Sequence, residues 1–540
     1  MASCPRCCRL QELRIRGFKS LRDVGLELRD VNILVGPNGS GKTAILETLL
    51  LLRDILDYVR GRVVNPFQRW WGYRNIAWRH DETHPVEIAL RLDCSRCNPD
   101  DILVYLDALG AAIYGEQAKV IAGRLIKHGV EYRVAVTGAG GGFQILREQL
   151  TIPGVCELTL EPAKLRIKLA GDVVGKAPIT LQDIASSVAT SLGAMNVQGE
   201  GVERRKERVE RAVAECLEKY EGVAKAWVSG FTQSLTRGIE VRTGLRGFLW
   251  LYAERERARS IWVDVLEEAW SLLPLPIILE ESPYATPPGA LVKCISRRLG
   301  ISAERVAESL ASALGVHLDL PLGEVAALAY IAVLVVGGFV DGIVVLRPLD
   351  YASLRSPQPL VAEGRLREDG SNLVAVLFRL GGGRLPEDVG VVLASVLNAE
   401  GVSGFFEPTP DGRVVLKLVV DGVELLPPSV PEGAWKTMAL MAAVLSNATV
   451  IAVDEFENSL HPSAQELLLE ELRRSGATVL VATHSPTVID AAKSLDEIIL
   501  LELVGGETRA TRVKDADKLA EKLRELGITP SEAILYRIGV

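Results

Sequence analysis

The sequence has no excess of positive charge and no apolar stretch long enough to cross a membrane. Its 540 residues include 61 lysines and arginines against 69 aspartates and glutamates, which gives a formal net charge of −8 and a pI of about 5.6. A basic field over the whole protein is therefore excluded, and any nucleic-acid contact would need a local groove. Residues 325–340 form the longest uncharged apolar run. This run falls short of the ~18–20 residues that span a bilayer, and a buried helix leading into a strand at residues 342–346 explains it better.

Targeting signals and nuclease motifs are also missing. Residues 1–10 lack the apolar core of a signal peptide, so we expect a soluble, cytoplasmic protein without a membrane partner. Neither a Toprim nor an HNH nuclease signature follows residue 485, and residues 99–340 contain no second catalytic motif. Basic and acidic residues alternate over residues 201–221, which is more typical of a solvated helix with i,i+4 ion pairs than of a DNA contact.

An octapeptide near the N-terminus has the composition of a phosphate-binding loop. It consists of Gly36, Pro37, Asn38, Gly39, Ser40, Gly41, Lys42 and Thr43. The apolar run 31–35 before it predicts a buried parallel strand, and apolar residues at helical spacing follow it. The glycines allow consecutive N–H groups to face phosphate oxygens, and the helix N-terminus adds a positive dipole end. We expect Lys42 to contact the β- and γ-phosphates of a nucleoside triphosphate and Thr43 to hold Mg²⁺.

A second strand near the other end of the chain ends in two carboxylates. Residues 449–453 are mostly apolar and are followed by Asp454 and Glu455. This pattern places both carboxylates at the carboxyl edge of a parallel sheet, where ligands bind in open α/β folds. Asp454 is predicted to anchor the Mg²⁺ shell, and Glu455 to act as the base that activates the attacking water.

A third apolar strand, at residues 477–483, is followed by His484. At a strand end, His484 can contact the γ-phosphate side of the site, and we assign it that sensing role. Most of the chain lies between Lys42 and Asp454. The two halves of one sheet must therefore come together around a large insertion.

With these motifs in place, the chain resembles the AAA-family predicted ATPases of the ABC/RecF/SMC/OLD-like P-loop superfamily. The resemblance rests on residues 13–23, on the sequence DEFENSLHP at 454–462, on THSP at 483–486, and on RP at 347–348 followed by DGSNL at 369–373. It implies an α/β fold, an ABC-type head with a parallel sheet and an antiparallel β-lobe, split by a large mixed, mostly helical insertion. The expected divisions are residues 1–98 and 341–505 for the two halves of the head, 99–340 for the insertion, and 506–540 for a C-terminal strand and helix.

The resemblance also implies a mechanism in which two heads sandwich ATP. Each site would then be completed by a signature segment of the opposite head, here within residues 429–436. Gly433 is the residue expected to contact ATP in trans. Pro431 stands where the family has serine and offers neither a hydroxyl nor an N–H group to a phosphate. Hydrolysis would therefore be slow or would need a partner.

Eight cysteines suggest reduced thiols or metal rather than a disulfide scaffold, if the protein is cytoplasmic. Two C-x-x-C pairs, Cys4 with Cys7 and Cys94 with Cys97, offer four ligands for a tetrahedral zinc site. The wide gap between the pairs weakens this assignment. Free thiols, or a disulfide as in a thermophile, are the alternatives.

Two interpretations remain open for the process that the ATPase cycle drives. One is a role in DNA repair, chromosome maintenance or anti-phage defence, with an ATP-dependent homodimer acting with DNA and a separate nuclease or effector. The other is a regulatory or scaffold switch that acts on a protein partner without DNA. A transporter ATPase is a third class, which the large insertion disfavours.

Overall fold

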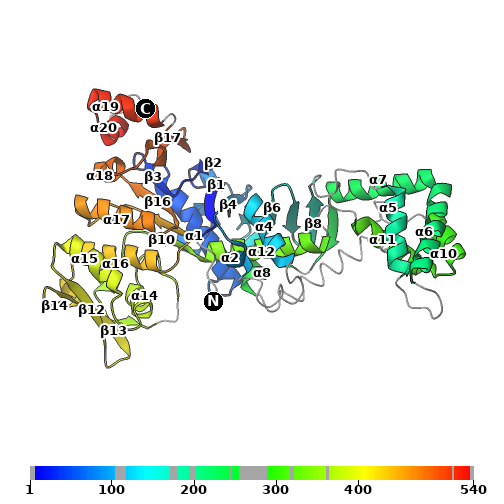
Figure 1. Ribbon diagram of the computed structural model, residues 1–540. Coiled ribbons are helices and arrows are strands. Elements are labelled where there is room, and N and C mark those ends of the chain that lie inside the picture. Colours follow the sequence, from blue (N-terminus) through cyan, green and yellow to red (C-terminus); the bar gives the residue numbers. More distant parts are fainter. Residues whose placement is uncertain are drawn as a thin grey trace. The chain divides into compact units, whose positions relative to one another are not determined.

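The computed structural model describes residues 7–103, 117–170, 180–193, 202–243, 245–254, 289–316, 322–360, 364–513 and 516–535. The chain divides into two compact units (Figure 1). Unit 1 takes residues 1–97, 133–144 and 335–540, and unit 2 takes residues 98–132 and 145–334. The short segment 133–144 lies within the predicted insertion but groups with unit 1.

A six-stranded sheet forms the centre of unit 1. Its order is β10 (Ile343–Leu346), β15 (Val450–Val453), β16 (Thr478–Thr483), β3 (Val31–Val35), β17 (Ile498–Val504) and β18 (Glu507–Arg512). The first five strands are parallel, and β18 is antiparallel to β17. Every residue of β10, β15, β16 and β3 is buried, as expected for parallel strands covered on both faces. The predicted α/β fold, with distant segments joined in one parallel sheet, is confirmed.

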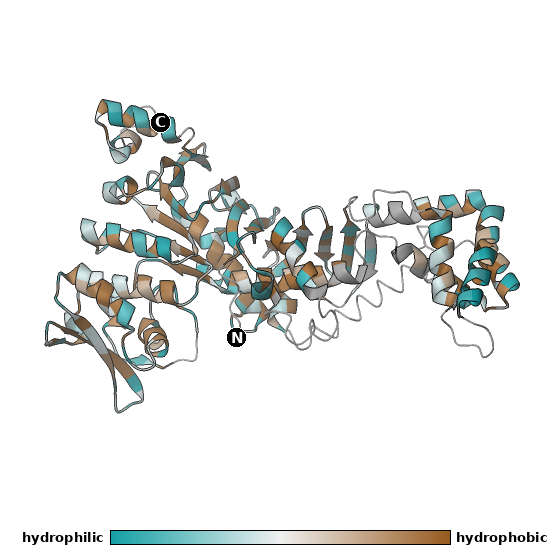
Figure 2. Ribbon diagram, viewed as in Figure 1, coloured by the Kyte–Doolittle hydropathy of each residue, from teal (hydrophilic) through white to brown (hydrophobic). Residues whose placement is uncertain are grey.

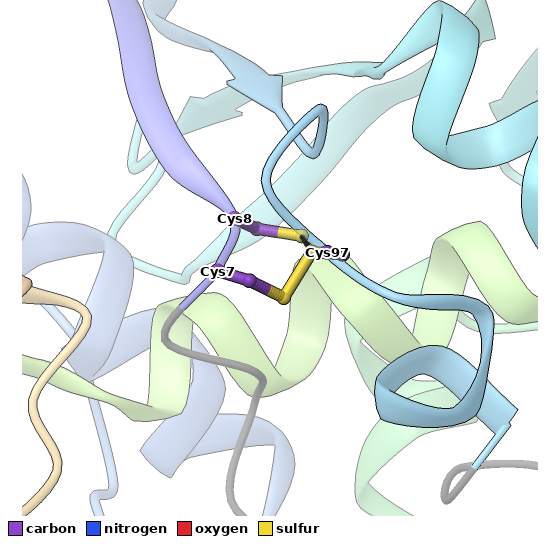
Figure 3. A group of neighbouring side chains, drawn as sticks. All are labelled: Cys7, Cys8 and Cys97. Atoms are coloured by element: carbon purple, nitrogen blue, oxygen red, sulfur yellow. Dashed lines mark hydrogen bonds between the residues drawn. A yellow bond between two sulfur atoms is a disulfide. The ribbon is translucent and has the colours of Figure 1, made fainter.

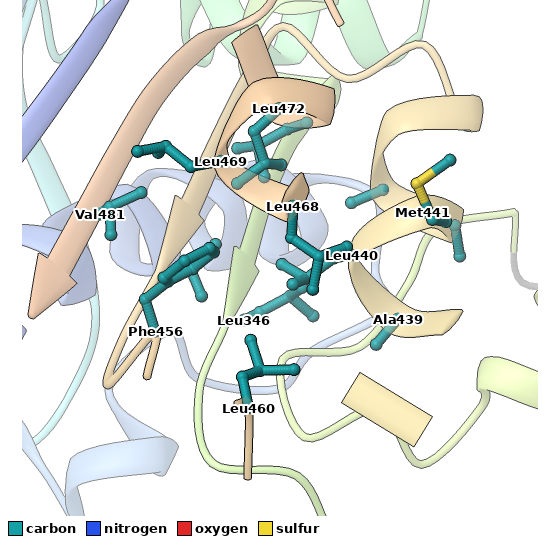
Figure 4. Packing of buried hydrophobic residues seen from close by; sticks show 14 of the residues in the cluster. Leu346, Ala439, Leu440, Met441, Phe456, Leu460, Leu468, Leu469, Leu472 and Val481 are labelled. Atoms are coloured by element: carbon teal, nitrogen blue, oxygen red, sulfur yellow. The ribbon is translucent and has the colours of Figure 1, made fainter. Parts of the chain in front are cut away.

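Helices with one apolar face pack against this sheet. The main ones in unit 1 are α1 (Lys42–Val59), α16 (Glu432–Leu445) and α17 (Pro462–Arg474). Figure 4 shows leucines of α17 and residues of α16 meeting Val481 of β16, Leu346 of β10 and Phe456 in one buried cluster. Figure 2 shows the same division, with hydrophobic residues on the inner faces and hydrophilic residues outside. Each fully buried leucine contributes roughly 1.5–3 kcal/mol, so this cluster holds the strand ends at the site in place.

The apolar run at residues 325–340 lies in the helix α12 (Leu322–Asp341), which leads directly into β10 as predicted. Nearly all residues of this run are buried. In the described part of the chain, no helix combines the length and apolarity that crossing a membrane requires.

An antiparallel lobe accompanies the parallel sheet, as the fold class predicted. Its order is β2 (Leu21–Glu27), β1 (Arg9–Phe18) and β4 (Val86–Asp93). Ile15 pairs with Val24 on one side and with Ile88 on the other. Leu13 and Ile15 are buried, whereas Arg14 and Arg16 point away from the core, which explains the alternation in the sequence. Leu10 N–H donates to Thr478 Oγ1 at 3.1 Å and so ties the lobe to β16.

A small sheet in the C-terminal half of unit 1 was not identified from the sequence. It contains β11 (Gln358–Pro359), β13 (Arg413–Val420), β12 (Val402–Pro408) and β14 (Val423–Leu425). The signal was present, because Val414, Leu416 and Leu418 alternate with more exposed residues after a turn at 409–412. Helices α13 (Tyr351–Leu354), α14 (Leu373–Leu380) and α15 (Glu387–Leu397) lie in the same half, and α18 (Pro486–Asp490), α19 (Ala516–Leu526) and α20 (Pro530–Leu535) follow β16 in the chain.

Unit 2 is mixed and mostly helical. Its strands β6 (Gln144–Ile152), β7 (Cys156–Glu161) and β8 (Lys164–Leu169) form an antiparallel meander, and β9 (Ile239–Arg242) pairs antiparallel with β8 after three intervening helices among the described residues. Its helices include α2 (Pro99–Leu103), α4 (Gln117–His128), α5 (Leu181–Gly193), α6 (Val202–Lys219), α7 (Glu221–Arg237), α8 (Phe248–Ala253), α10 (Gly289–Leu299) and α11 (Ala303–Val316), and β5 (Val130–Thr137) begins in this unit. A disulfide between Cys216 and Cys294 joins α6 to α10.

Candidate active site

The glycine-rich loop lies between β3 and α1 and packs closely against β17 and β18. A Cβ atom on Gly36 would lie 2.2 Å from the Leu501 carbonyl oxygen, and one on Gly41 would lie 2.3 Å from Thr508 Oγ1. Gly41 also has φ of +103°, which side chains disfavour. The loop therefore requires glycine at these positions for packing as well as for close approach to a phosphate.

Lys42 is the first residue of α1 and is only 8% exposed. Its Nζ donates to the carbonyl oxygens of Gly36 at 2.6 Å and Pro37 at 3.1 Å. Burial lowers the pKa of Lys42, and the nearby carboxylates of Asp454, Glu457 and Glu455 oppose this shift in part. The ammonium is thus held inside the loop by groups that a triphosphate could replace.

Asp454 follows β15 and is 6% exposed. Thr43 lines the same pocket as Asp454, although the two residues come from opposite ends of the sequence. Burial raises the pKa of Asp454, while the nearby Thr43 hydroxyl and the charge of Arg347 act against the shift. A carboxylate and a hydroxyl in one pocket offer oxygen donors of the kind that Mg²⁺ prefers, so these two residues fit the predicted metal site.

Glu455 is exposed and has φ of +46°, in the left-handed region that few residues other than glycine adopt. The Asn458 side-chain amide donates to Glu455 Oε2. Phe456 N–H donates to the Ala482 carbonyl at 3.1 Å, which fixes the turn against β16. The unusual backbone angle at Glu455 is therefore held by contacts on both sides, as at many functional sites.

Glu457 connects this turn to the segment that carries His484, a role that the sequence did not suggest. Its carboxylate accepts hydrogen bonds from Thr483 Oγ1 at 2.7 Å and from His484 N–H at 2.8 Å. His484 is exposed at the end of β16. The backbone position of His484 is thus set by the loop that also contains Asp454 and Glu455.

One pocket of about 340 Å³ is lined by Lys42, Thr43, Asp454, Glu455 and His484, together with other residues of the loop and of residues 19–20. The structure therefore brings together the residues predicted for phosphate binding, metal binding, water activation and sensing. Their roles remain predictions.

Glu47, on α1, also lines this pocket and was not anticipated. It is 3% exposed and forms ion pairs with Lys19 and with Arg347, whose Nη1 lies 3.6 Å from Glu47 Oε1. Arg347 belongs to the RP pair of the resemblance, and its N–H donates to the Glu368 carbonyl at 2.8 Å. Glu47 thus positions two cations from distant segments near the pocket.

Lys436, on α16, is the third functional candidate that the sequence analysis missed, after Glu457 and Glu47. Its Nζ donates to the Glu455 carbonyl oxygen at 2.6 Å. The side chain is 7% exposed, and burial lowers the pKa of Lys436 to about 8 against the pull of Glu457, Glu455 and Asp454. A buried lysine is uncommon, and this one supports the strained residue that is predicted to activate water. We assign Lys436 a positioning role.

Replacing Lys436 by methionine is expected to lower kcat for ATP hydrolysis by about 10- to 100-fold and to change ATP affinity by less than about threefold, because the Glu455 carbonyl loses its hydrogen bond from Lys436.

Hydrolysis by the unmodified chain should fall as the pH rises through about 8, where Lys436 loses its proton. Lys436→Arg keeps the charge and should move this limb to higher pH. Loss of the folded state does not explain this decrease in activity. Because the pKa of Lys436 lies below its ordinary value of 10.5, the unfolded chain holds this proton more tightly, and the free energy of unfolding rises with pH between about 8 and 10.5. An unchanged kcat in Lys436→Met would contradict the assignment.

The signature segment lies at the start of α16. Pro431 is the N-cap residue, and Gly433 lies in the first turn of the helix. A Cβ atom on Gly433 would lie 2.5 Å from the Ser459 carbonyl oxygen, so glycine is required there for packing. Gly433 does not line the pocket of its own chain. Its contact with ATP in trans remains a prediction.

Three of the four cysteines predicted from the C-x-x-C spacing, Cys7, Cys94 and Cys97, lie together, and Cys4 lies outside the described residues. Cys7 is bonded to Cys97 (Figure 3). Cys8, which the prediction did not include, is bonded to Cys94 and joins the group. The register of β1 and β4 explains this, because Arg9 pairs with Asp93 and the preceding and following residues therefore meet.

Two segments of the chain match known families. Residues 9–103 match the family described as "AAA ATPase domain", and residues 355–490 match the family described as "AAA domain, putative AbiEii toxin, Type IV TA system". A stretch of 86 residues is 33% identical to an OLD nuclease of Thermus scotoductus, which is 16% of this chain and 14% of that relative.

Solved structures of SMC heads are similar over most of both chains. An SMC head bound to the C-terminal winged-helix domain of ScpA has a TM-score of 0.38 at 11% identity, covering 94% of this chain and 99% of that one. An SMC head with a coiled coil and joint from Pyrococcus yayanosii has a TM-score of 0.36 at 13% identity, covering 96% and 100%. The two matched segments supply strands β3, β15 and β16 of the six-stranded sheet. The chain thus contains a P-loop domain similar to AAA-type ATPases, in two parts that lie far apart in the sequence.

Proposed function

We propose that this chain binds ATP with Mg²⁺ and hydrolyses the terminal phosphate bond in the pocket described above. The observation that carries this proposal is that Lys42 and Thr43 line one pocket together with Asp454 and Glu455. These residues come from both ends of the chain, and a purely structural loop would not need them together.

Each residue has a defined task in this proposal. The amides of the loop and Lys42 hold the phosphates, and Glu455 accepts a proton from the attacking water while Lys436 and Asn458 keep it oriented. Thr43 and Asp454 would hold Mg²⁺, which offsets negative charge on the phosphate oxygens when bound. His484, which lines the same pocket, would sense the γ-phosphate. In a steady-state assay of phosphate release, hydrolysis should require Mg²⁺ and stop with a chelator.

We further propose that ATP joins two heads, each covering the pocket of the other with its signature segment. Gly433 lies in the first turn of α16, whose N-terminal amides suit an anion, and Pro431 in the serine position removes one donor. A slow basal rate is the expected consequence. Sedimentation with and without ATP tests the association.

The cycle is proposed to act on DNA together with a separate nuclease or effector. The partial match to an OLD nuclease supports this direction, although it covers only a small part of that protein. The acidic net charge of −8 favours the alternative, a switch that acts on a protein partner without DNA.

Double-stranded DNA is expected to raise the ATPase rate about threefold or more at ~50 mM salt, and the stimulation should disappear near ~200 mM salt, because phosphate contacts release counterions. Glu455→Gln, measured in parallel, reports any contaminating ATPase. If DNA has no effect at low salt, the protein-switch alternative is favoured.

A further inference from the structure

The start of β1 and the turn after β4 hold a group of cysteines at the edge of the lobe. Cys7 and Cys8 directly precede β1, and Cys94 directly follows β4. The Cα atoms of Cys8 and Cys94 lie 4.2 Å apart, and those of Cys7 and Cys97 lie 4.8 Å apart. Cys97 N–H donates to the Cys94 carbonyl at 3.0 Å, which closes the C-x-x-C segment into a tight turn. The backbone therefore presents four sulfur atoms to one place.

The sulfur atoms themselves form one cluster (Figure 3). Those of Cys7, Cys8 and Cys97 all lie within 4.8 Å of one another, and Cys8 Sγ lies 3.5 Å from Cys97 Sγ across the two disulfides. Cys94 is bonded to Cys8 and completes the set. In a tetrahedral zinc site, Zn–S bonds of about 2.3 Å place the sulfur atoms about 3.8 Å apart. The 3.5 Å between Cys8 Sγ and Cys97 Sγ, which belong to different disulfides, is already close to that value.

Two disulfides between the same two short segments are a poor explanation for this convergence. A cross-link stabilises a fold mainly by shortening the loop that the unfolded chain must close. The Cys7–Cys97 bond closes a loop with a sequence separation of 90 residues. The Cys8–Cys94 bond lies inside that loop, so once the first bond has formed it restricts only the few residues between the two bonds. The β1–β4 ladder joins the same segments a third time. A shared ligand gives all four cysteines a use, whereas a second disulfide adds little.

The surroundings suit a bound cation with thiolate ligands. Cys8, Cys94 and Cys97 are 2%, 0% and 6% exposed, so the sulfurs are shielded from water. Four thiolates around one divalent cation leave a charge of −2, which needs nearby positive groups. Arg9, adjacent to Cys8, and Arg96, within the C-x-x-C turn, both form ion pairs with Asp30. Two guanidinium groups against one carboxylate leave this group of three residues with a net positive charge.

We propose that the reduced chain binds one zinc ion through Cys7, Cys8, Cys94 and Cys97. A thiol or phosphine reductant supplies two electrons to each disulfide and yields four thiols. Zinc then binds the four sulfurs and displaces up to four protons to solvent. The site clamps the start of β1 to the end of β4. It does not depend on the proposed ATPase activity, and it replaces the Cys4 of the sequence prediction by Cys8.

The test measures metal in the full-length chain purified under a phosphine reductant. Elemental analysis should find one zinc per chain, and a titration of the reduced, metal-free chain with Co²⁺ should produce the thiolate-to-cobalt absorption at one equivalent. Both Cys8→Ser and Cys94→Ser should lose at least about 100-fold in zinc affinity, since three-sulfur sites bind more weakly. Cys156→Ser, a buried cysteine outside the cluster, is the matched control and should keep its zinc.

Two results would overturn the proposal. A reduced wild-type chain that takes up neither zinc nor cobalt would leave only structural disulfides. Loss of zinc in Cys4→Ser, with zinc retained in Cys8→Ser, would return the site to the set predicted from the C-x-x-C spacing. Because the cobalt titration uses the unmodified chain, a variant that fails to fold does not affect the first outcome.

Discussion

Replacing Glu455 by glutamine is expected to slow ATP hydrolysis by about two to four orders of magnitude while ATP remains bound, because a carboxamide cannot accept the proton of the attacking water. The substitution keeps the size of the side chain and its contact with Asn458. The strained backbone at this position should therefore be preserved. Single-turnover hydrolysis and equilibrium binding of ATP, measured on the same preparation, separate the two effects.

The same variant should accumulate as an ATP-bound dimer, since the complex cannot proceed to hydrolysis. Glu466→Gln is the matched control, because Glu466 is an exposed carboxylate on α17 that does not line the pocket. It should hydrolyse ATP at the wild-type rate. Hydrolysis by Glu455→Gln at the wild-type rate would show that another group activates the water.

Replacing Lys42 by alanine is expected to weaken ATP binding by at least about 100-fold. Hydrogen bonds that involve charged groups are worth about 1.5–3 kcal/mol each, and Lys42 is proposed to make more than one with the phosphates. Direct titration with ATP and Mg²⁺ measures the loss. Lys493→Ala, which removes an exposed lysine paired with Glu470, should bind ATP normally.

Unfolding does not provide an alternative explanation for that loss. Burial lowers the pKa of Lys42, so the charged form is disfavoured by the fold before any nucleotide arrives. Removing it should leave the thermal midpoint without ATP unchanged or slightly higher. If Lys42→Ala binds ATP as tightly as the unmodified chain does, the loop is not the phosphate site.

The parts of the site that could be predicted from sequence are those in which a local pattern carries the chemistry. The glycine spacing around Lys42 reflects close packing against β17 and β18, and the position of Asp454 follows from an apolar strand that ends in polar residues. The antiparallel lobe was predictable because burial alternates along β1 and β2. In each case a short segment contains the whole signal.

The parts that were missed depend on contacts between segments. Glu457, in the loop after β15, contacts the end of β16 by accepting a hydrogen bond from Thr483 Oγ1. Lys436, on α16, donates to the Glu455 carbonyl oxygen. Nothing within either segment marks these residues as special. Cys8 joins the cysteine group because the register of β1 and β4, in which Arg9 pairs with Asp93, brings it beside Cys94. Motif spacing alone does not contain that register.

The central claim is that two ends of the chain build one triphosphate pocket. Its most direct test is labelling with an ATP analogue that carries a photoreactive group on the γ-phosphate, with the modified residues mapped by mass spectrometry. We predict label both in residues 36–43 and in residues 454–457 or 483–485, removed in each case by excess ATP. Label confined to one of the two segments, or label that ATP does not displace, would contradict the claim.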